Sequence, residues 1–411
     1  MFNQPTYLVQ VGFQGKNRVV EAVSDDFADG GILSPADYKK RKTQDIADKI
    51  NSYGGYVLFD PQFYIPRTDR QDLNTYPYFE ARGGDDFSTG MFSRQAEREA
   101  LCQDVLAIQD DFDVHAYISP ARYLRNFTST ELDRWLDLTE SFIELAQVEG
   151  RDIPVFASLP VDGYELKNES RRNRLLNQVT KIDPDGFYTS VCYNDLDERL
   201  PLKGENNVYS YLKLMSSLRM NRYEVIAGHT HQIAHLLFGL GINAFASGHN
   251  QNLRAFDVDR WEPSDEEQFA QRVVRYYSDK VLDSIRVDSG LDNIAESGIA
   301  DKVRMNSPYE AGLFDPSTTP AESGWNYSDE SWEHYIWSCG EIKERYVGED
   351  IETRMNKATQ KIDDAESTYD DVVSEVDSLD SVENQIYDDW RSGYNRVSDE
   401  INITRLSLIV E

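Results

Sequence analysis

The chain has 411 residues, enough for one large domain with an appendage, and its 73 acidic and 42 basic residues give a formal net charge of −31. Only 14 of the basic residues are lysine. This pattern predicts a halophilic protein, kept in solution at high salt, where repulsion between distant charges is screened. The alternative is a chain whose acidic surface repels nucleic acid at low salt unless a local basic groove overrides it.

The cysteines and the apolar runs argue against disulfide-rich, cysteine–zinc and membrane-spanning proteins. Cys102, Cys192 and Cys339 are far apart and match no ligand spacing, so we expect free thiols in a reducing compartment. No apolar stretch approaches the roughly 20 residues of a spanning helix, and the first residues lack the basic and apolar runs of a targeting segment. We therefore expect a soluble, cytoplasmic protein with no membrane partner.

Strand-like and helix-like segments alternate along the first 250 residues. Apolar runs predict strands near residues 7–11, 56–59, 114–118, 154–158, 187–192, 223–227 and 242–246. Helical patterns fall at 36–52, 93–108, 130–148, 169–179 and 208–218. These repeats predict an α/β protein with a (β/α)8, TIM-type barrel over residues 1–340, its eighth strand around 284–287. An open doubly wound sheet is the alternative, but no Gly-rich dinucleotide or phosphate loop follows any strand.

In the same region, Asp60 ends the hydrophobic strand of YVLFDPQFYIPR, and Gln62 and Tyr64 follow it in the loop. A carboxylate at the carboxyl end of a barrel strand can act as general base, nucleophile or ligand. Because Pro61 follows it, Asp60 can also simply cap a turn. Asp162 and Asp195 also follow strands, in turn-forming contexts.

The tightest repeat lies between Arg222 and Arg254. An apolar run ends at Gly228, apolar residues then recur at helical spacing, and glycines at 239 and 241 end this helix before an extended pattern resumes. Such a β-α-β unit places the residues after each strand at one end of the sheet, where chemistry is expected. They are His229, His231, Ser247, His249, Asn250 and Arg254.

From residue 341 the composition changes, because residues 341–411 contain 19 acidic and 8 basic residues. Apolar residues from Ile351 to Leu379 alternate steps of four and three over four heptads, which predicts a coiled-coil helix. A turn signal at 377–381 and a second apolar stripe from Val382 to Ile401 predict an acidic helical hairpin. This hairpin packs on its own barrel or forms an interface with a second copy or a protein partner through 351–401.

The histidines and arginines allow two further kinds of site. If the strand before them stays extended, His229 and His231 point to the same side, and with His249 they could hold a divalent metal. A helix beginning at Thr230 would turn them apart. Arg122 and Arg254 are candidates for binding an anionic group such as a phosphate, because guanidinium presents a fork of donors; the alternative is a salt bridge on the acidic surface.

The stretch from Ser93 to Phe256 resembles the tRNA-guanine transglycosylase barrel family. KIDPDGFYTSVCYND at 181–195 is similar to that family's segment leading into its base-recognition strand, and residues 222–254 are similar to its following β-α-β run. The matching positions are Tyr223, Gly228, Gly241, Phe245 and Arg254. The family's two catalytic aspartates would fall at Ala246 and near Ser119, its glycine-rich loop becomes residues 191–194, and its zinc cluster is absent.

The resemblance implies nucleoside-directed glycosyl transfer or base exchange on tRNA or DNA, without a cofactor, with relocated carboxylates. Asp60 and Asp195 are the best placed for this role. The predicted substrate-binding residues are Gln62, Tyr64, Ser119, Arg122, Tyr193, Asn194, His229, His231, Ser247, His249, Asn250 and Arg254. Two alternatives remain, a metal-dependent hydrolase using His229, His231 and His249 and a non-catalytic barrel that acts as a binding or scaffold protein.

Overall fold

The computed structural model describes residues 1–65, 73–80, 94–193, 201–261, 273–376, 379 and 385–410. The chain divides into two compact units. The first comprises Met1–Asp197, Lys213–Thr230 and Ile242–Pro263, and the second comprises Glu198–Leu212, His231–Gly241 and Ser264–Glu411. The second unit thus includes more of the chain than the acidic segment 341–411.

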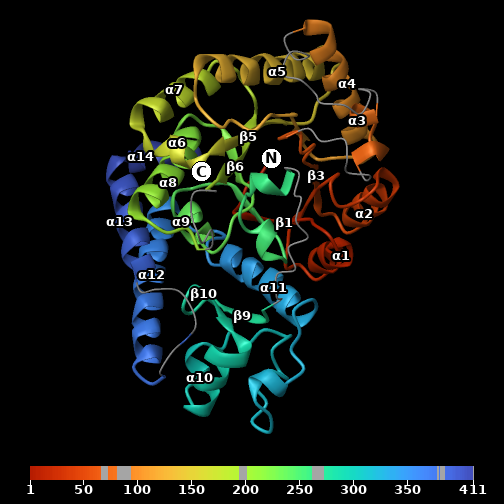
Figure 1. Ribbon diagram of the computed structural model, residues 1–411. Coiled ribbons are helices and arrows are strands. Elements are labelled where there is room, and N and C mark those ends of the chain that lie inside the picture. The colour runs from red at the N-terminus through yellow and green to blue at the C-terminus, as the bar shows by residue number, and fades with distance from the viewer. Residues whose placement is uncertain are drawn as a thin grey trace. The chain divides into compact units, whose positions relative to one another are not determined.

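The first unit is built on eight parallel strands in the order β3-β2-β1-β8-β7-β6-β5-β4. Figure 1 labels β1, β3, β5 and β6 of this sheet. The strands are β1 Thr6–Gln10, β2 Gly30–Leu33, β3 Tyr56–Phe59, β4 Tyr117–Ile118, β5 Val155–Asp162, β6 Gly186–Cys192, β7 Glu224–Ala227 and β8 Ala244–Ser247. The outer strands β3 and β4 meet at His115, whose backbone N–H donates to the Val57 carbonyl at 2.9 Å. The sheet is therefore a nearly closed barrel, which confirms the predicted (β/α)8 fold.

Alternate residues of the strands fill the barrel interior, because strand side chains have a period of two. Leu8, Ile32, Leu58 and Phe156 belong to one buried cluster there. Phe2 joins this cluster and packs edge-on against Tyr56, with ring centroids 5.4 Å apart. The amino-terminal end of the barrel interior, where Phe2 packs, is therefore filled by apolar side chains.

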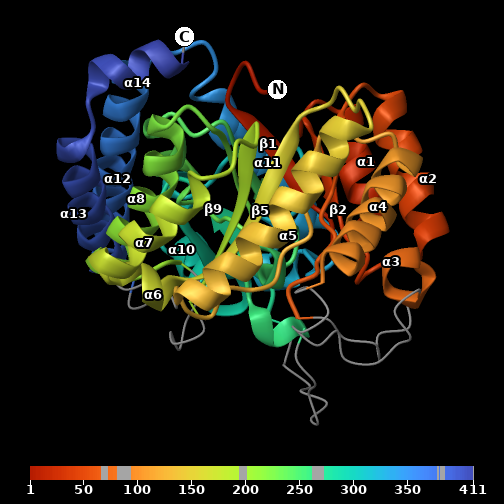
Figure 2. The same cartoon turned by 90° about the horizontal axis from the view of Figure 1, so that it is seen from above.

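Helices lie outside the sheet, and α4 and α5 run side by side (Figure 2). The helices through the last barrel repeat are α1 Lys16–Ser24, α2 Lys40–Ser52, α3 Pro77–Glu80, α4 Gln95–Asp111, α5 Ser129–Val148, α6 Gly163–Lys167, α7 Glu169–Val179, α8 Glu205–Met220 and α9 Ala234–Gly239. Thr128 begins α5 by accepting a hydrogen bond from the Glu131 N–H, and Trp135 and Phe142 bury its apolar face.

The predicted position of the eighth strand is wrong. The missing barrel strand is β2, whose sequence GGIL lacks the β-branched and aromatic enrichment of a typical strand. Gly30 is required because a Cβ there would lie 2.1 Å from the Tyr56 carbonyl oxygen. Residues 284–286 instead lie in β10 (Asp283–Arg286), which pairs antiparallel with β9 (Arg275–Ser278) in the second unit, and Val287 begins the following π-turn.

The second unit contains the predicted helical hairpin. Besides α9, the second unit contains the helices α10 Asp292–Glu296, α11 Glu330–Glu344, α12 Ile351–Val373, α13 Gln385–Glu400 and α14 Ile403–Val410. The hairpin is formed by α12 and α13. The seam residues Ile351, Ala358, Ile362 and Ala365 are buried, and α12 packs along α9 and α13. Further along the seam, Val372 joins the core beneath β9 and β10. The seam is therefore covered within this unit, while most of the turn at 377–381 lies outside the described residues.

Short helical turns complete the fold. The 3-10 segments are Leu73–Thr75, Gln251–Leu253, Val258–Trp261, Ala300–Lys302 and Pro320–Glu322, and a π-turn spans Val287–Leu291. Among the helices in the described ranges, none has the length and apolar character needed to cross a bilayer.

Candidate active site

The candidate site lies at the carboxyl end of the barrel strands, around Asp60. Pro61 ends β3, and the backbone of Gln62 takes a φ of +49°, a left-handed conformation that is rare for a side chain of this size. The turn directs the Gln62 N–H to Asp60 Oδ1 at 2.9 Å and the Tyr64 hydroxyl to Asp60 Oδ2 at 2.7 Å. Asp60 is thus buried, with only 1% of its surface exposed, and held by its own loop.

Burial raises the pKa of Asp60 to about 6, although hydrogen bonds from Tyr64, Gln62 and Tyr188 act in the opposite direction. A carboxyl with this pKa exchanges its proton near neutral pH, as a general acid or base must. Burial also raises the pKa of the Tyr64 and Tyr188 hydroxyls well above the ordinary value. Both tyrosines therefore stay protonated and serve as hydrogen-bond donors to Asp60.

Neighbouring strand ends extend this network. The Tyr188 hydroxyl, from β6, lies 3.4 Å from Asp60 Oδ2 and 3.1 Å from Oε1 of Gln10, the last residue of β1. Ser34, which follows β2, donates to Gln62 Oε1 at 2.6 Å. Side chains from β1, β2, β3 and β6 therefore converge, as in the active sites of (β/α)8 enzymes.

Aromatic rings cover Asp60. The Tyr64 ring packs edge-on against Phe256 at 5.0 Å and Trp261 at 5.1 Å, measured between ring centroids. His229 lies 5.4 Å from Phe256, and burial lowers the pKa of its imidazole to about 3, so this ring is neutral at physiological pH. We call Tyr64, Tyr123, Phe256 and Trp261 the aromatic cluster. The four rings are buried against one another, and the Tyr64 hydroxyl connects them to the Asp60 carboxyl.

Several polar side-chain atoms near this network are buried without a hydrogen-bond partner among the described residues. They include Nε2 of Gln10, Nε1 of Trp261 and both ring nitrogens of His229. An unsatisfied buried donor costs about 1–3 kcal/mol, so such groups in native proteins usually bind water or a ligand. An ordered water or a ligand with hydrogen-bond acceptors would satisfy the donors among these groups.

The three histidines of the predicted metal site, His229, His231 and His249, have different contacts in the structure. The backbone φ of His229 is +51°, so the extended geometry that would align it with His231 ends before this position. His231 accepts from the Leu202 N–H at 3.3 Å, and His249 Nε2 lies 3.1 Å from the Phe13 carbonyl oxygen. Helix α9 begins at Ala234 rather than at Thr230.

The alternative metal site is not assembled by these histidines. Across the described ranges, no group of three or more His, Cys, Asp or Glu side chains could hold a metal ion. The physical reason is that His231 and His249 each bond to separate parts of the chain, while His229 faces Phe256.

Other predicted site residues have clear structural contacts. Ser119 Oγ accepts from the Ser158 N–H at 3.0 Å and ties β4 to β5. The ring of Tyr193 packs so closely on Gly163 that a Cβ on Gly163 would lie 2.2 Å from this ring. The Ser247 carbonyl accepts from the Tyr7 hydroxyl at 3.3 Å. The roles predicted for Ser119, Tyr193 and Ser247 in binding substrate stay predictions.

The loop after β8 is held by its own side chains. Asn250 caps the 3-10 segment 251–253 by accepting from the Asn252 N–H. Arg254 donates to the backbone carbonyls of Gly248 at 3.1 Å and His249 at 2.6 Å. These two bonds hold the Arg254 guanidinium against the backbone of the loop. Asn194 and Asp195 lie outside the described residues, so their predicted roles are not described by the structure.

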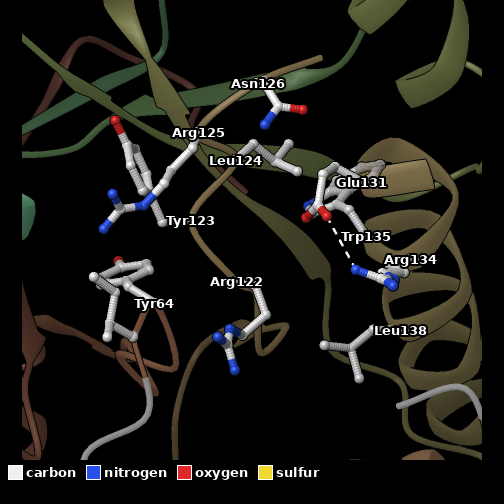
Figure 3. Close-up of a pocket in the computed structure, with 11 residues that line it drawn as sticks. Tyr64, Arg122, Tyr123, Leu124, Arg125, Asn126, Glu131, Arg134, Trp135 and Leu138 are labelled. Atoms are coloured by element: carbon white, nitrogen blue, oxygen red, sulfur yellow. Dashed lines mark hydrogen bonds and ion pairs between the residues drawn. The ribbon is translucent and has the colours of Figure 1, made fainter. Parts of the chain in front are cut away.

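Arg122 lines a cavity of about 280 Å³ beside the aromatic cluster, which we call the arginine pocket (Figure 3). Its lining residues are Tyr64, Ile65, Arg122, Tyr123, Leu124, Arg125, Asn126, Glu131, Arg134, Trp135 and Leu138. Burial lowers the pKa of Arg122 to about 10, which leaves the guanidinium charged at neutral pH. Tyr64 connects the pocket to Asp60, because its side chain lines the cavity and its hydroxyl donates to the Asp60 carboxyl.

Several residues of this region were not predicted from the sequence. Gln10 carries a signal, since it is a polar residue that closes the otherwise apolar strand TYLVQ. Tyr188 shares one strand face with Ser190 and Cys192 by the period of two, which also marks it as a candidate. Arg125 and Trp261 carry no local signal, because only the folded chain brings them to Tyr64.

No model of a known protein family matches the chain, and no curated protein matches it. The resemblance to the transglycosylases therefore stays a prediction, and the function is proposed from the geometry of the site.

Proposed function

We propose that the barrel end around Asp60 is the active site of an enzyme that performs glycosyl transfer or base exchange on nucleosides of tRNA or DNA. The observation that carries this proposal is the Asp60 carboxyl, buried beside aromatic rings with a pKa of about 6. A nucleobase is flat and has hydrogen-bond acceptors on its edge. Proteins that act on bases hold them by stacking on aromatic side chains and by hydrogen bonds to that edge.

In the proposed reaction, Asp60 gives a proton to the leaving base and takes one from the incoming base. When the bond between C1′ and the base nitrogen breaks, its electron pair stays on the nitrogen, and the protonated Asp60 carboxyl donates the proton that neutralises the leaving base. The resulting carboxylate then takes the N–H proton of the incoming base, whose nitrogen forms the new bond to C1′. Tyr64 and Tyr188 orient the carboxyl through both steps. We propose that a second carboxylate attacks C1′, and Asp195 is the other carboxylate that the sequence predicts for this site.

The same site supports a non-catalytic alternative less well. The missing aspartates favour this alternative. The transglycosylase resemblance would put them at Ala246 and near Ser119, and both of these residues are fully buried. A pure binding protein does not need a carboxyl buried at a cost in solvation. The raised pKa of Asp60 therefore favours catalysis.

The test is the incorporation of radiolabelled nucleobases into tRNA and into DNA at high potassium chloride. Replacing Asp60 by Asn keeps the shape of the side chain and removes its proton chemistry, so the Asp60→Asn variant is expected to lower turnover about a hundredfold or more. The control is Asp185→Asn at the opposite end of the strands, where the carboxylate accepts from the Val155 N–H. Turnover unchanged in Asp60→Asn would eliminate the catalytic assignment.

The proposed setting is a salt-rich cytoplasm. The net charge of −31 and the three buried free cysteines support it. A homodimer or a protein partner through residues 351–401 is also a proposal, supported by the acidic, solvent-facing sides of α12 and α13.

A further inference from the structure

A group of cations lies on the first two barrel helices of this strongly acidic chain. Residues 38–42 read YKKRK, and the sequence has no other run of more than two adjacent cations. Five of the 14 lysines fall within the 34 residues from Lys16 to Lys49. We call Lys16, Lys39, Lys40, Arg41, Lys42 and Lys49 the basic patch. In a chain with a net charge of −31, such a concentration of positive charge needs a local reason.

The two helices bring the cations of the patch together. α1 and α2 pack side by side (Figures 1 and 2). Lys42 and Lys49 are seven residues apart, which is two helical turns, so they share one face of α2. A side-chain hydrogen bond with Lys42 and the charge of Lys42, together with the charge of Lys49, lower the pKa of Lys16. The three amines therefore form one cluster across α1 and α2.

Carboxylates neutralise only part of this charge. Lys40 pairs with Asp111 at 2.8 Å. α2 also carries Asp48 and Asp45, the second of which acts to raise the pKa of Lys16. In the ranges that the structure describes, no salt bridge joins a carboxylate to any of the other five cations of the patch. If all three carboxylates are counted against the six cations, three positive charges remain.

The cations also occupy positions where a helix disfavours them. Lys39 is the N-cap of α2 and makes no side-chain capping bond, and Lys40, Arg41 and Lys42 follow in a first turn without an acidic residue. The partial positive charge at a helix N-terminus stabilises carboxylates there and destabilises cations. The arrangement thus lowers the stability of α2, and a segment that breaks a local rule in this way is expected to serve a function.

The basic patch begins at the same end of the barrel as Asp60. α1 follows β1 and α2 follows β2, so the first residues of both helices lie at the carboxyl end of the strands, as Asp60 does after β3. The Tyr38 hydroxyl joins the two helices here, because it accepts from the Lys16 N–H at 3.1 Å and donates to the Gly12 carbonyl at 3.0 Å. A polymer bound along the patch would therefore reach the end of the barrel where Asp60 lies.

We propose that the basic patch binds the phosphate backbone of a nucleic acid, with Lys16 and Lys42 at its centre. Lysine ammonium groups bind phosphates as point charges, and a local basic surface is what an acidic protein needs in order to approach a polyanion. The choice of a nucleic acid among polyanions rests on the proposed function, whereas the anionic character of the partner rests on the patch alone. The bound strand would present its nucleoside to the site around Asp60.

The experiment measures the binding of fluorescently labelled tRNA and of a double-stranded DNA oligonucleotide to the full chain by anisotropy. It covers the range of potassium chloride in which circular dichroism shows the protein folded. The double variant Lys16→Gln, Lys42→Gln is expected to weaken binding about tenfold or more at the lowest salt. It should also reduce the slope of log affinity against log salt by about one to two, because each lost phosphate contact releases about one counterion fewer.

A second variant and a matched control make this result specific. Lys39→Gln with Arg41→Gln changes two exposed side chains and should act in the same direction as the first variant. The control is Lys181→Gln with Lys302→Gln, which removes the same charge where each ammonium already has a partner, Gln178 at 2.7 Å and Asp371 at 3.2 Å. This control should leave the affinity and the salt slope unchanged.

The outcomes separate the possible partners. Patch-dependent binding of tRNA alone, of DNA alone or of both supports the proposal and names the nucleic acid. Equal effects of the patch and control variants would overturn it, as would patch-dependent binding of phosphatidylglycerol vesicles by a protein that binds neither nucleic acid.

The same variants distinguish this proposal from the proposed function. Asp60→Asn lies outside the patch and is expected to bind nucleic acid as the wild type does. Unchanged base exchange in Asp60→Asn, together with patch-dependent binding, would refute the proposed function and retain the patch. Loss of exchange in Asp60→Asn, together with binding that does not respond to the patch variants, would refute the patch and retain the proposed function.

Discussion

Asp60 combines two roles that the sequence presented as alternatives. Its Oδ1 accepts from the Gln62 N–H, as a turn-capping aspartate does, and its Oδ2 accepts from the Tyr64 hydroxyl inside the barrel. The capping contact explains why the carboxyl is held in place, and burial explains why its pKa is raised. One residue is therefore both a structural element of the loop and the candidate acid of the site.

The raised pKa of Asp60 predicts a specific pH dependence of stability. The folded state keeps the proton up to about pH 6, whereas the unfolded chain loses it near 3.8, so this group stabilises the fold at low pH and its contribution is lost as the pH rises from about 4 to 6. The difference amounts to about 3 kcal/mol. Asp60→Asn removes it, so urea unfolding should show the variant gaining stability relative to the wild type between pH 4 and 7. A difference that does not change with pH would contradict the raised pKa.

The two tyrosines that contact Asp60 should affect its proton differently. Tyr64→Phe removes a hydrogen bond of 2.7 Å to the ionised carboxylate, worth about 1.5–3 kcal/mol, and is expected to shift the pH profile of turnover upward by one to two units. Tyr188→Phe removes a longer contact of 3.4 Å and serves as the graded comparison, with a smaller shift in the same direction. A downward shift in either variant would refute the assignment of the profile to Asp60.

At the scale of elements, α9 is the helix on which the second unit assembles. A Cβ at Gly239 would lie 2.4 Å from the Tyr394 hydroxyl and 2.6 Å from Ala358, so α9 touches both α12 and α13 without space for a larger residue. His235 of α9 bonds to Asp279 at 2.8 Å, and Lys361 of α12 pairs with the same carboxylate at 2.9 Å. The predicted hairpin is thus joined to α9 by close packing and by a buried charge.

Asp279 should be a strong determinant of stability. Burial would raise the pKa of Asp279, but Lys361, His235 and Arg345 offset this and hold it well below the usual range. Its contribution is therefore present at neutral pH and is lost as the pH falls. Asp279→Asn leaves the buried Lys361 ammonium without its carboxylate and is expected to lower the free energy of unfolding by about 3–5 kcal/mol, measured by urea denaturation.

The comparison for Asp279 is Asp288→Asn. Asp288 pairs with Arg286 at 3.0 Å, but its side chain is 59% exposed, and pairs of this kind contribute about 0–1 kcal/mol. Equal losses of unfolding free energy in Asp279→Asn and Asp288→Asn would show that the network around Asp279 stabilises the fold no more than an exposed ion pair.

For the molecule as a whole, the net charge of −31 predicts that stability depends on salt. Repulsion between like charges opposes the compact state, and the screening length shortens from about 10 Å at 0.1 M to about 3 Å at 1 M salt. The midpoint of thermal unfolding is therefore expected to rise steeply with potassium chloride, measured by circular dichroism from low to molar salt. A midpoint that stays flat over this range would remove the halophilic interpretation.

Three features could be predicted from the sequence: the alternation of strands and helices, the β-α-β unit between Arg222 and Arg254, and the hairpin after residue 341. These features depend on local periodicity, which the chain carries in each segment. The strand β2 was not predicted because its glycines are required by contacts with distant residues, Gly30 with the Tyr56 backbone and Gly31 with the Val19 side chain. Local pattern also marked Asp60, since a carboxylate that ends an apolar strand is visible without the fold.

Only the tertiary structure decided what surrounds Asp60. Tyr188 reaches it from 128 positions along the chain, and Arg122 meets Tyr64 across a cavity that no segment forms alone. The same holds for the histidines, which a short spacing suggested as metal ligands and which the left-handed backbone at His229 turned apart. Periodicity is a property of neighbouring residues, whereas burial, pKa and the charge of a pocket are sums over groups that only folding brings within a few ångströms.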